Sequence, residues 1–181
     1  MPPTLTTPSA QKLADYTTPA LMVPQLQSQG RAAVIVELCA LLQREGRLHD
    51  LTTFSDAVMR REQLSSTSIA CGWALPHARL NGLPRLTFTL ARSSQPFVWS
   101  TEALCPVHTV FLFAAPEPEA KTYLNLISAV ARLSQNSALV DQLRRAPDAR
   151  NMFAVLQQVP VFRATPVIPA SAARRAPLLK V

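Results

Sequence analysis

The run from Val107 to Ala115 is almost continuously apolar, and it limits the folds that this chain can adopt. A half-buried strand would alternate apolar and polar side chains, whereas an unbroken apolar run is typical of a strand that is buried on both faces. Such a strand needs a covering layer above and below it. The run therefore predicts a layered domain in which helices cover a central sheet.

Helical patterns lie on both sides of this run. Residues 31–44 place apolar side chains at i, i+3, i+4 and i+7, and Gly46 follows as a residue that commonly ends helices. A second helix is expected to begin at Asp50 or Thr52 and to end near Glu62. Helical spacing returns over residues 117–134, and two short amphipathic helices are predicted over residues 137–145 and 148–157, with Ser137 and Asp148 as their caps.

Strand patterns fall mainly between the two helical blocks. Residues 69–75 are apolar, residues 86–91 alternate, and residues 20–26 are compatible with a short edge strand beside two prolines. Together with the central run, these segments predict an α/β fold with α+β-like grouping of its elements. The expected domain has a small mixed β-sheet flanked by helices.

The two ends of the chain differ in composition from its middle. Residues 1–18 are rich in proline and threonine, and we expect a flexible leader there. Residues 160–181 contain four prolines and no acidic residue, which predicts a disordered basic tail after a single domain of residues 19–159. The tail holds four basic residues: Arg163, Arg174, Arg175 and Lys180. Without these four residues the net charge falls from +7 to +3, so we expect no nucleic-acid partner for the domain. Binding of nucleic acid or anionic lipid by the tail stays open.

The cysteines and the hydropathy pattern indicate the compartment. Cys39, Cys71 and Cys105 are odd in number, widely spaced and set in apolar stretches, which argues against a disulfide framework. No segment reaches the roughly 18 uninterrupted apolar residues of a membrane-spanning helix. We therefore expect a cytoplasmic protein without a membrane span.

Several common chemistries lack their motifs in this chain. The three histidines do not form an HExxH pattern, and no paired CxxC is present, so no metal is expected. The four glycines, Gly30, Gly46, Gly72 and Gly82, cannot build a P-loop or a GxGxxG turn. We expect no cofactor.

His77 is the residue with the clearest chemical potential. It follows an apolar run and Pro76, which predicts an imidazole at a strand end. With an ordinary pKa of about 6.5, a histidine is mostly neutral in the cytoplasm and can act as a nucleophile toward phosphorus. Donors for phosphoryl oxygens are close in sequence: Arg61, Ser66, Thr67, Ser68 and Arg79. From these residues alone, a structural or surface role for His77 is the more common outcome.

The segment from Arg61 to Arg79 resembles the signature of enzyme IIA domains of the fructose, mannitol and nitrogen-regulatory type from bacterial sugar phosphotransferase systems. In that family, R-E-x-x-x-S-T precedes G-x-A-I/L-P-H, and the histidine accepts a phosphoryl group. The resemblance covers about residues 13–158. It implies that His77 is the acceptor and that Arg61 helps to hold the phosphoryl group. It also implies an HPr-type phosphocarrier as donor, and a regulated protein or a IIB-type protein as the next partner.

The chain departs from the family pattern near this site. A second histidine is usual in a T-H-L setting, where this chain has Thr122, Tyr123 and Leu124. Tyr123 can donate a hydrogen bond but does not titrate near pH 7. Ser68 also stands where glycine is typical. Two functions therefore stay open: a phosphoryl relay with a regulatory output of the nitrogen-regulatory type, and a non-transferring module on the same fold that controls a kinase or a transporter.

Overall fold

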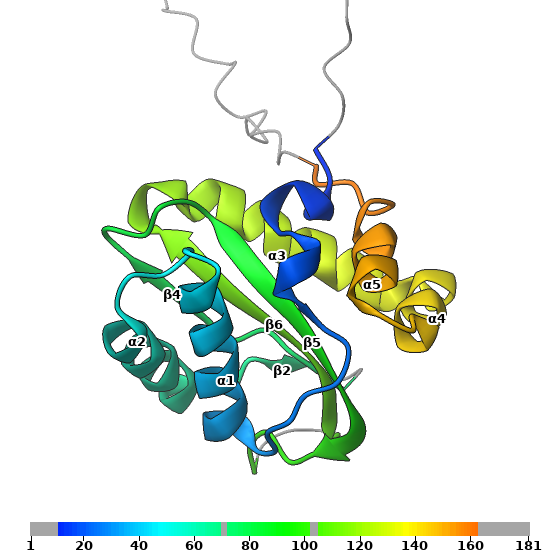
Figure 1. The fold of residues 1–181 in the computed structure, drawn as a ribbon, viewed down its shortest axis with the longest axis horizontal. Helices are drawn as coiled ribbons and strands as arrows, with labels where there is room; N and C mark the ends of the chain where they lie inside the picture. Colours follow the sequence, from blue (N-terminus) through cyan, green and yellow to red (C-terminus); the bar gives the residue numbers. More distant parts are fainter. Residues whose placement is uncertain (1–10, 70–71, 102–104, 163–181) are drawn as a thin grey trace, which may run out of the picture.

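The computed structural model describes residues 11–69, 72–101 and 105–162, and it contains one mixed sheet flanked by helices (Figure 1). The strands lie in the order β1-β5-β6-β3-β2, and β4 pairs with β6 as well. Their bounds are Met22–Val23 (β1), Ser68–Ile69 (β2), Trp73–Ala74 (β3), His77–Leu80 (β4), Thr87–Phe97 (β5) and Val107–Pro116 (β6). The expected fold class is confirmed.

Strand β6 lies at the centre of the sheet. It runs antiparallel to β5 and parallel to both β3 and β4, which follow one another along its other edge. Its side chains from Thr109 to Pro116 are buried. The apolar run is therefore a strand that is buried on both faces, as predicted, because other elements pack against each face.

Helices cover the sheet on two sides, as Figure 1 shows. Their bounds are Arg31–Arg44 (α1), Leu51–Leu64 (α2), Ala120–Gln135 (α3), Ser137–Arg145 (α4) and Ala149–Leu156 (α5). Helices α1 and α2 lie side by side on one side, and α3, α4 and α5 are grouped on the other. Asp50 and Asp148 cap α2 and α5 as expected, whereas Asn136 rather than Ser137 caps α4.

Both ends of the packed domain differ from the expected boundaries. Residues 13–16 form a 3-10 helix (η1), and the side chain of Leu13 is fully buried. The Leu13 amide donates to the Val159 carbonyl at 3.0 Å, and the Val161 amide donates to the Gln11 carbonyl at 2.7 Å. The expected leader of residues 1–18 and tail of residues 160–181 therefore each include residues of the domain, because the few apolar side chains among the prolines pack into it. Residues 1–10 and 163–181 lie outside the described residues.

The apolar segment before His77 is not one strand. Gly72 has a φ of 75°, a conformation that favours glycine, and it separates β2 from β3 in an antiparallel pair. Leu75 and Pro76 then separate β3 from β4. His77 is thus the first residue of β4 rather than a residue that follows a strand, because each short strand forms its own pairing with a neighbour.

Candidate functional site

His77 lies half-buried at an edge of the sheet, where β4 pairs only with β6 among the described strands. Its backbone is paired in register with Phe113, and the Phe113 amide donates to the Pro76 carbonyl at 3.0 Å. Helix α2 packs beside β4, and α3 follows β6 after a short 3-10 helix, Glu117–Glu119 (η3). A surface cavity of about 520 Å³ opens between these elements, and His77, Arg61 and Tyr123 line it.

One hydrogen bond determines which nitrogen of His77 can react. Nδ1 lies 3.0 Å from the Leu75 carbonyl oxygen. A carbonyl oxygen can only accept, so this contact assigns the proton to Nδ1 and leaves a lone pair on Nε2. Nε2 is therefore the nitrogen that can attack an electrophile from the cavity.

The surroundings of His77 favour the neutral imidazole. Burial lowers the pKa of His77, the hydrogen bond to Leu75 opposes this effect, and the positive charge of Arg61 lowers the pKa further. Smaller opposing effects come from the Glu62 carboxylate, which raises the pKa, and from Arg79, which lowers it. The imidazole is therefore uncharged at neutral pH, as a nucleophile must be.

Two arginines on different elements face the same cavity. Arg61 is on α2, and its Nη1 donates to the Ser65 carbonyl at 2.9 Å, which fixes the guanidinium near the end of the helix. Arg79 is on β4, two residues beyond His77, and is exposed. Guanidinium groups bind phosphoryl oxygens with paired hydrogen bonds, so this pair can hold a dianion beside Nε2.

The three hydroxyl residues of the motif do not act together. Thr67 lines the cavity, but its amide and its hydroxyl both donate to the Glu62 carboxylate. The hydroxyls of Ser66 and Ser68 lie 2.9 Å from each other, and neither residue lines the cavity. The structure thus brings Thr67 to the site and keeps Ser66 and Ser68 away from it.

Tyr123 lies against His77 in the place that the resemblance gives to a second histidine. The two ring centroids are 5.2 Å apart, and the Tyr123 ring also packs edge-on against Phe113 at 5.9 Å. Burial raises the pKa of Tyr123 to about 12, so its hydroxyl keeps its proton. Tyr123 can therefore donate a hydrogen bond to a bound group but cannot exchange a proton near neutral pH.

Glu62 is a site residue that the sequence reasoning missed. Its side chain is buried, with 2% exposed, and it accepts from the Thr67 amide at 3.3 Å, from the Thr67 hydroxyl, and from the Trp99 indole at 2.9 Å. The bonds from Thr67 tie the loop before β2 to α2, and the bond from Trp99 ties the segment after β5 to the same helix. The signal was present in the sequence, because Glu62 lies four residues after the core residue Val58 on the buried face of α2.

No group of three potential metal ligands occurs within the described ranges. In the same ranges, no helix is long and apolar enough to cross a membrane. The polar groups that line the cavity are one imidazole, two guanidiniums, one phenol and the side chain of Thr67. These groups are suited to receiving a phosphoryl group.

Comparison with known families agrees with the fold and with the site. The family described as "Phosphoenolpyruvate-dependent sugar phosphotransferase system, EIIA 2" matches residues 16–159. The fold and the site thus define an enzyme IIA domain of the second type. The chain belongs to this family.

The relatives include nitrogen-regulatory proteins and sugar-specific enzymes IIA. A "Nitrogen regulatory protein" from Bradyrhizobium diazoefficiens is 27% identical over 152 residues, which cover 84% of this chain and 99% of the relative. The crystal structure of a nitrogen regulatory protein IIA-Ntr from Neisseria meningitidis aligns with a TM-score of 0.68 at 20% identity, over 80% of this chain and 98% of that one. The mannitol enzyme IIA of Escherichia coli, solved in complex with its phosphorylated enzyme IIB, aligns with a TM-score of 0.65 at 13% identity, over 77% of this chain and 95% of that one.

Proposed function

We propose that this chain accepts a phosphoryl group on Nε2 of His77 from an HPr-type phosphocarrier and signals through its phosphorylation state, as a cytoplasmic regulator of the nitrogen-regulatory type. The observation that carries this proposal is the hydrogen bond from Nδ1 to the Leu75 carbonyl, because it leaves Nε2 as the nucleophile beside two arginines. Membership of the phosphotransferase family supplies the chemical context.

The proposed step balances without a proton transfer at His77. The lone pair of Nε2 forms the new N–P bond while the N–P bond of the donor phosphohistidine breaks, and the donor nitrogen keeps that electron pair. The ring of His77 retains its proton on Nδ1 throughout. Arg61 and Arg79 balance the charge of the transferred group, and the Tyr123 hydroxyl supplies a further donor.

The surface around the cavity suits a protein partner. Leu64 on α2 is 84% exposed and Leu124 on α3 is 61% exposed. Leu124 lines the cavity at His77, and Leu64 lines a neighbouring cavity that also includes His77 and both arginines. Apolar side chains around a charged centre are typical of a docking patch that excludes water during transfer. A donor carrier, and a regulated target or a IIB-type acceptor, would use this face in turn.

Incubation with phosphoenolpyruvate, enzyme I and an HPr-type carrier tests the relay directly. Intact mass spectrometry should show the gain of one phosphoryl group, absent from His77→Gln and present in His49→Gln, where an exposed histidine is replaced. No mass gain, or a gain that survives His77→Gln, would reject the proposal.

The second candidate is a binding module that does not transfer phosphate and controls a kinase or a transporter. Tyr123 favours it, because the phenol replaces the histidine that the family usually places there. If the native chain accepts no phosphoryl group and Tyr123→His does, the module is the better description. If both accept the group, the relay stands.

A further inference from the structure

The cavity next to the phosphoryl site, of about 400 Å³, lies on the side of helix α2. His77, Arg61 and Arg79 line both cavities, whereas Arg60 and Leu64 line only this second one. Helix α2 packs beside β4, the strand that carries His77 and Arg79 (Figure 1). The surface around the phosphoryl site therefore continues over α2.

This surface is positively charged. The charged residues that line the two cavities are three arginines, Arg60, Arg61 and Arg79, and one glutamate, Glu117. No carboxylate among the described residues forms an ion pair with any of these arginines. The carboxylate of Glu62, next to Arg61 in the sequence, is buried and already accepts three hydrogen bonds from the chain.

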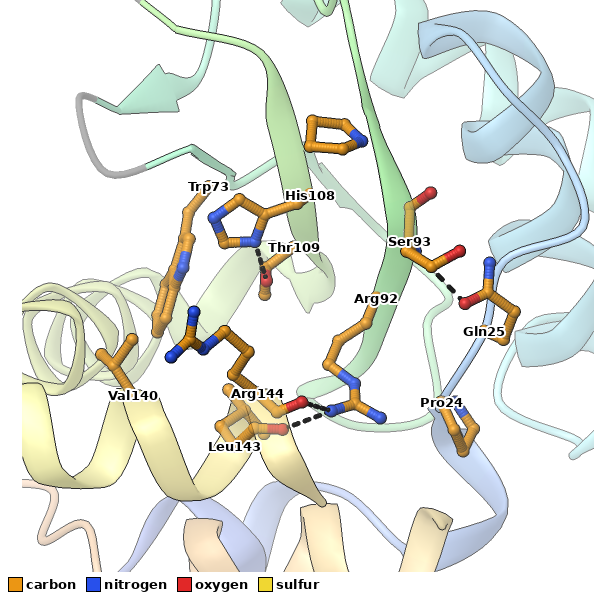
Figure 2. A pocket seen from close by; sticks show the side chains of 12 residues that line it. Pro24, Gln25, Trp73, Arg92, Ser93, His108, Thr109, Val140, Leu143 and Arg144 are labelled. Atoms are coloured by element: carbon orange, nitrogen blue, oxygen red, sulfur yellow. Dashed lines mark hydrogen bonds between the residues drawn. The ribbon is translucent and has the colours of Figure 1, made fainter. Parts of the chain in front are cut away.

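The two arginines near the start of β6 differ from those around His77. Arg92 donates to the carbonyls of Leu143 and Arg144 at 2.6 Å (Figure 2). Arg144 pairs with Asp141 at 3.0 Å. Both arginines thus have partners within the chain, whereas the arginines around His77 present unpaired charge to groups outside it.

Arg60 is not needed for the phosphoryl group itself, because it does not line the cavity in which Nε2 of His77 reacts. It is exposed and lies four residues before Leu64, and side chains at this spacing are neighbours on the surface of a helix. Leu64 is 84% exposed. The pair, which we call the α2 rim, offers a protein partner one charged contact and one apolar contact beside the phosphoryl site.

We propose that the α2 rim binds a phosphocarrier that has carboxylates around its phosphohistidine. Charge complementarity carries this choice, because an acidic carrier would meet three unpaired guanidiniums and a basic carrier would be repelled by them. Charges at the edge of an interface act mainly on the association rate and on the choice of partner. The inference rests on the function proposed for His77, since it names the kind of donor that would use this site.

Two forms of one HPr-type carrier test the charge preference in the full chain. They have either glutamate or lysine at the exposed positions around the active histidine, and both are used without phosphate, so that binding is measured apart from transfer. Isothermal titration calorimetry at low salt should show about tenfold tighter binding of the glutamate form, and the difference should shrink as salt screens the charges. Equal affinities, tighter binding of the lysine form, or no binding of either form would overturn the proposal.

Charge-reversal variants locate the preference on α2. Arg60→Glu should weaken binding of the glutamate form about tenfold and strengthen binding of the lysine form, because attraction is replaced by repulsion. Arg150→Glu on the exposed surface of α5 and Arg174→Glu in the basic C-terminal segment change the net charge equally, and both affinities should stay as in the native chain. If Arg174→Glu had the same effect as Arg60→Glu, the proposal would be rejected in favour of a contact with the C-terminal segment.

The kinetics of transfer separate docking from chemistry. The glutamate form is phosphorylated with phosphoramidate, freed of reagent and mixed with each variant. Arg60→Glu should raise the carrier concentration at half-maximal rate about tenfold without changing the maximal rate, whereas Arg61→Gln lowers the maximal rate. A lower maximal rate in Arg60→Glu would contradict a docking role.

The two sets of measurements distinguish failure of this inference from failure of the relay. If His77 accepts the phosphoryl group equally well from both carrier forms, the relay stands and the acidic partner is rejected. If the glutamate form binds through Arg60 but His77 gains no phosphoryl group, the relay is rejected, and the α2 rim still selects an acidic partner.

Discussion

His77 is held at one nitrogen by Leu75 and surrounded by groups that oppose its protonation. Because burial and Arg61 lower the pKa of His77 below its ordinary value of about 6.5, the neutral ring persists to lower pH than in a free histidine. We expect the contribution of His77 to the phosphorylation rate to be flat between about pH 8 and 6.5 and to fall only below that window. An NMR titration of the His77 ring protons gives the pKa itself.

The same shift affects stability with a definite sign. Between the folded and unfolded pKa values of His77 the unfolded chain binds more protons, so stability falls as the pH drops from about 6.5 through the lower folded value. His77→Gln should lose this part of the pH dependence, as measured by urea unfolding at several pH values. A folded pKa of His77 above 6.5 would contradict both expectations.

Arg61 is expected to act mainly on transfer rather than on stability. Arg61→Gln should slow phosphorylation of His77 by about 10²–10³, the usual effect of removing one donor to a developing charge. Arg61→Lys should restore only part of the rate, because an ammonium cannot form the paired hydrogen bonds of a guanidinium. The rates are measured by intact mass spectrometry of samples quenched at successive times. Arg44→Gln, which replaces an exposed arginine on α1, is the matched control. Equal rates in all three variants would remove Arg61 from the site.

At the scale of single residues, the sequence predicted more of the site through resemblance than through chemistry. The motif pointed to His77 and Arg61, the departure from the family pattern pointed to Tyr123, and the structure brings all three together. It could not predict that Ser66 and Ser68 bond to each other, because the direction of a hydroxyl depends on tertiary contacts. The sequence also could not predict that the proton of His77 is on Nδ1, because this depends on the position of the Leu75 carbonyl oxygen relative to the ring.

Among the elements, helix α4 is tied to the sheet by the side chain of Arg92. Arg92 on β5 satisfies three carbonyls at the end of α4, and helix ends leave such groups without partners inside the helix. Arg92→Gln should lower the free energy of unfolding by about 2–3 kcal/mol, because hydrogen bonds to charged groups contribute about that much. Arg145→Gln, whose side chain is 76% exposed, should stay within about 0.5 kcal/mol in the same urea experiment. If the two variants had the same free energy of unfolding, the carbonyls at the end of α4 would be satisfied without Arg92.

The helices were predictable because their signals are local. Apolar spacing and Gly46 define α1, and the observed helix, Arg31–Arg44, has the predicted bounds. The strands before His77 were not, since their breaks depend on pairing with β6, which is distant in the sequence. Periodicity cannot show that an apolar run of this length turns at Gly72.

Across the whole molecule, the two ends of the described chain meet and close one side of the core. Lys12 forms an isolated antiparallel bridge with Pro160, and the buried side chains of Leu13 and Val161 lie next to it in sequence. The composition of the two ends predicted that Leu13 and Val161 belong to segments outside the domain, because apolar residues are few among the prolines of those segments. Packing of a small number of buried side chains outweighs that composition.

This closure makes Leu13 a core residue despite its place among the first residues of the domain. Leu13→Ala should lower the free energy of unfolding by about 2–4 kcal/mol, because a fully buried leucine loses its contacts and leaves a cavity. Leu64→Ala, at a leucine that is 84% exposed, should stay within about 0.5 kcal/mol in the same urea titration. Deletion of residues 1–18 should cost at least as much as Leu13→Ala, since it also removes the Thr17 hydroxyl that donates to the Phe88 carbonyl at 2.8 Å. If the deletion and the leucine variant were both as stable as the native chain, the domain would begin where composition placed it, at residue 19.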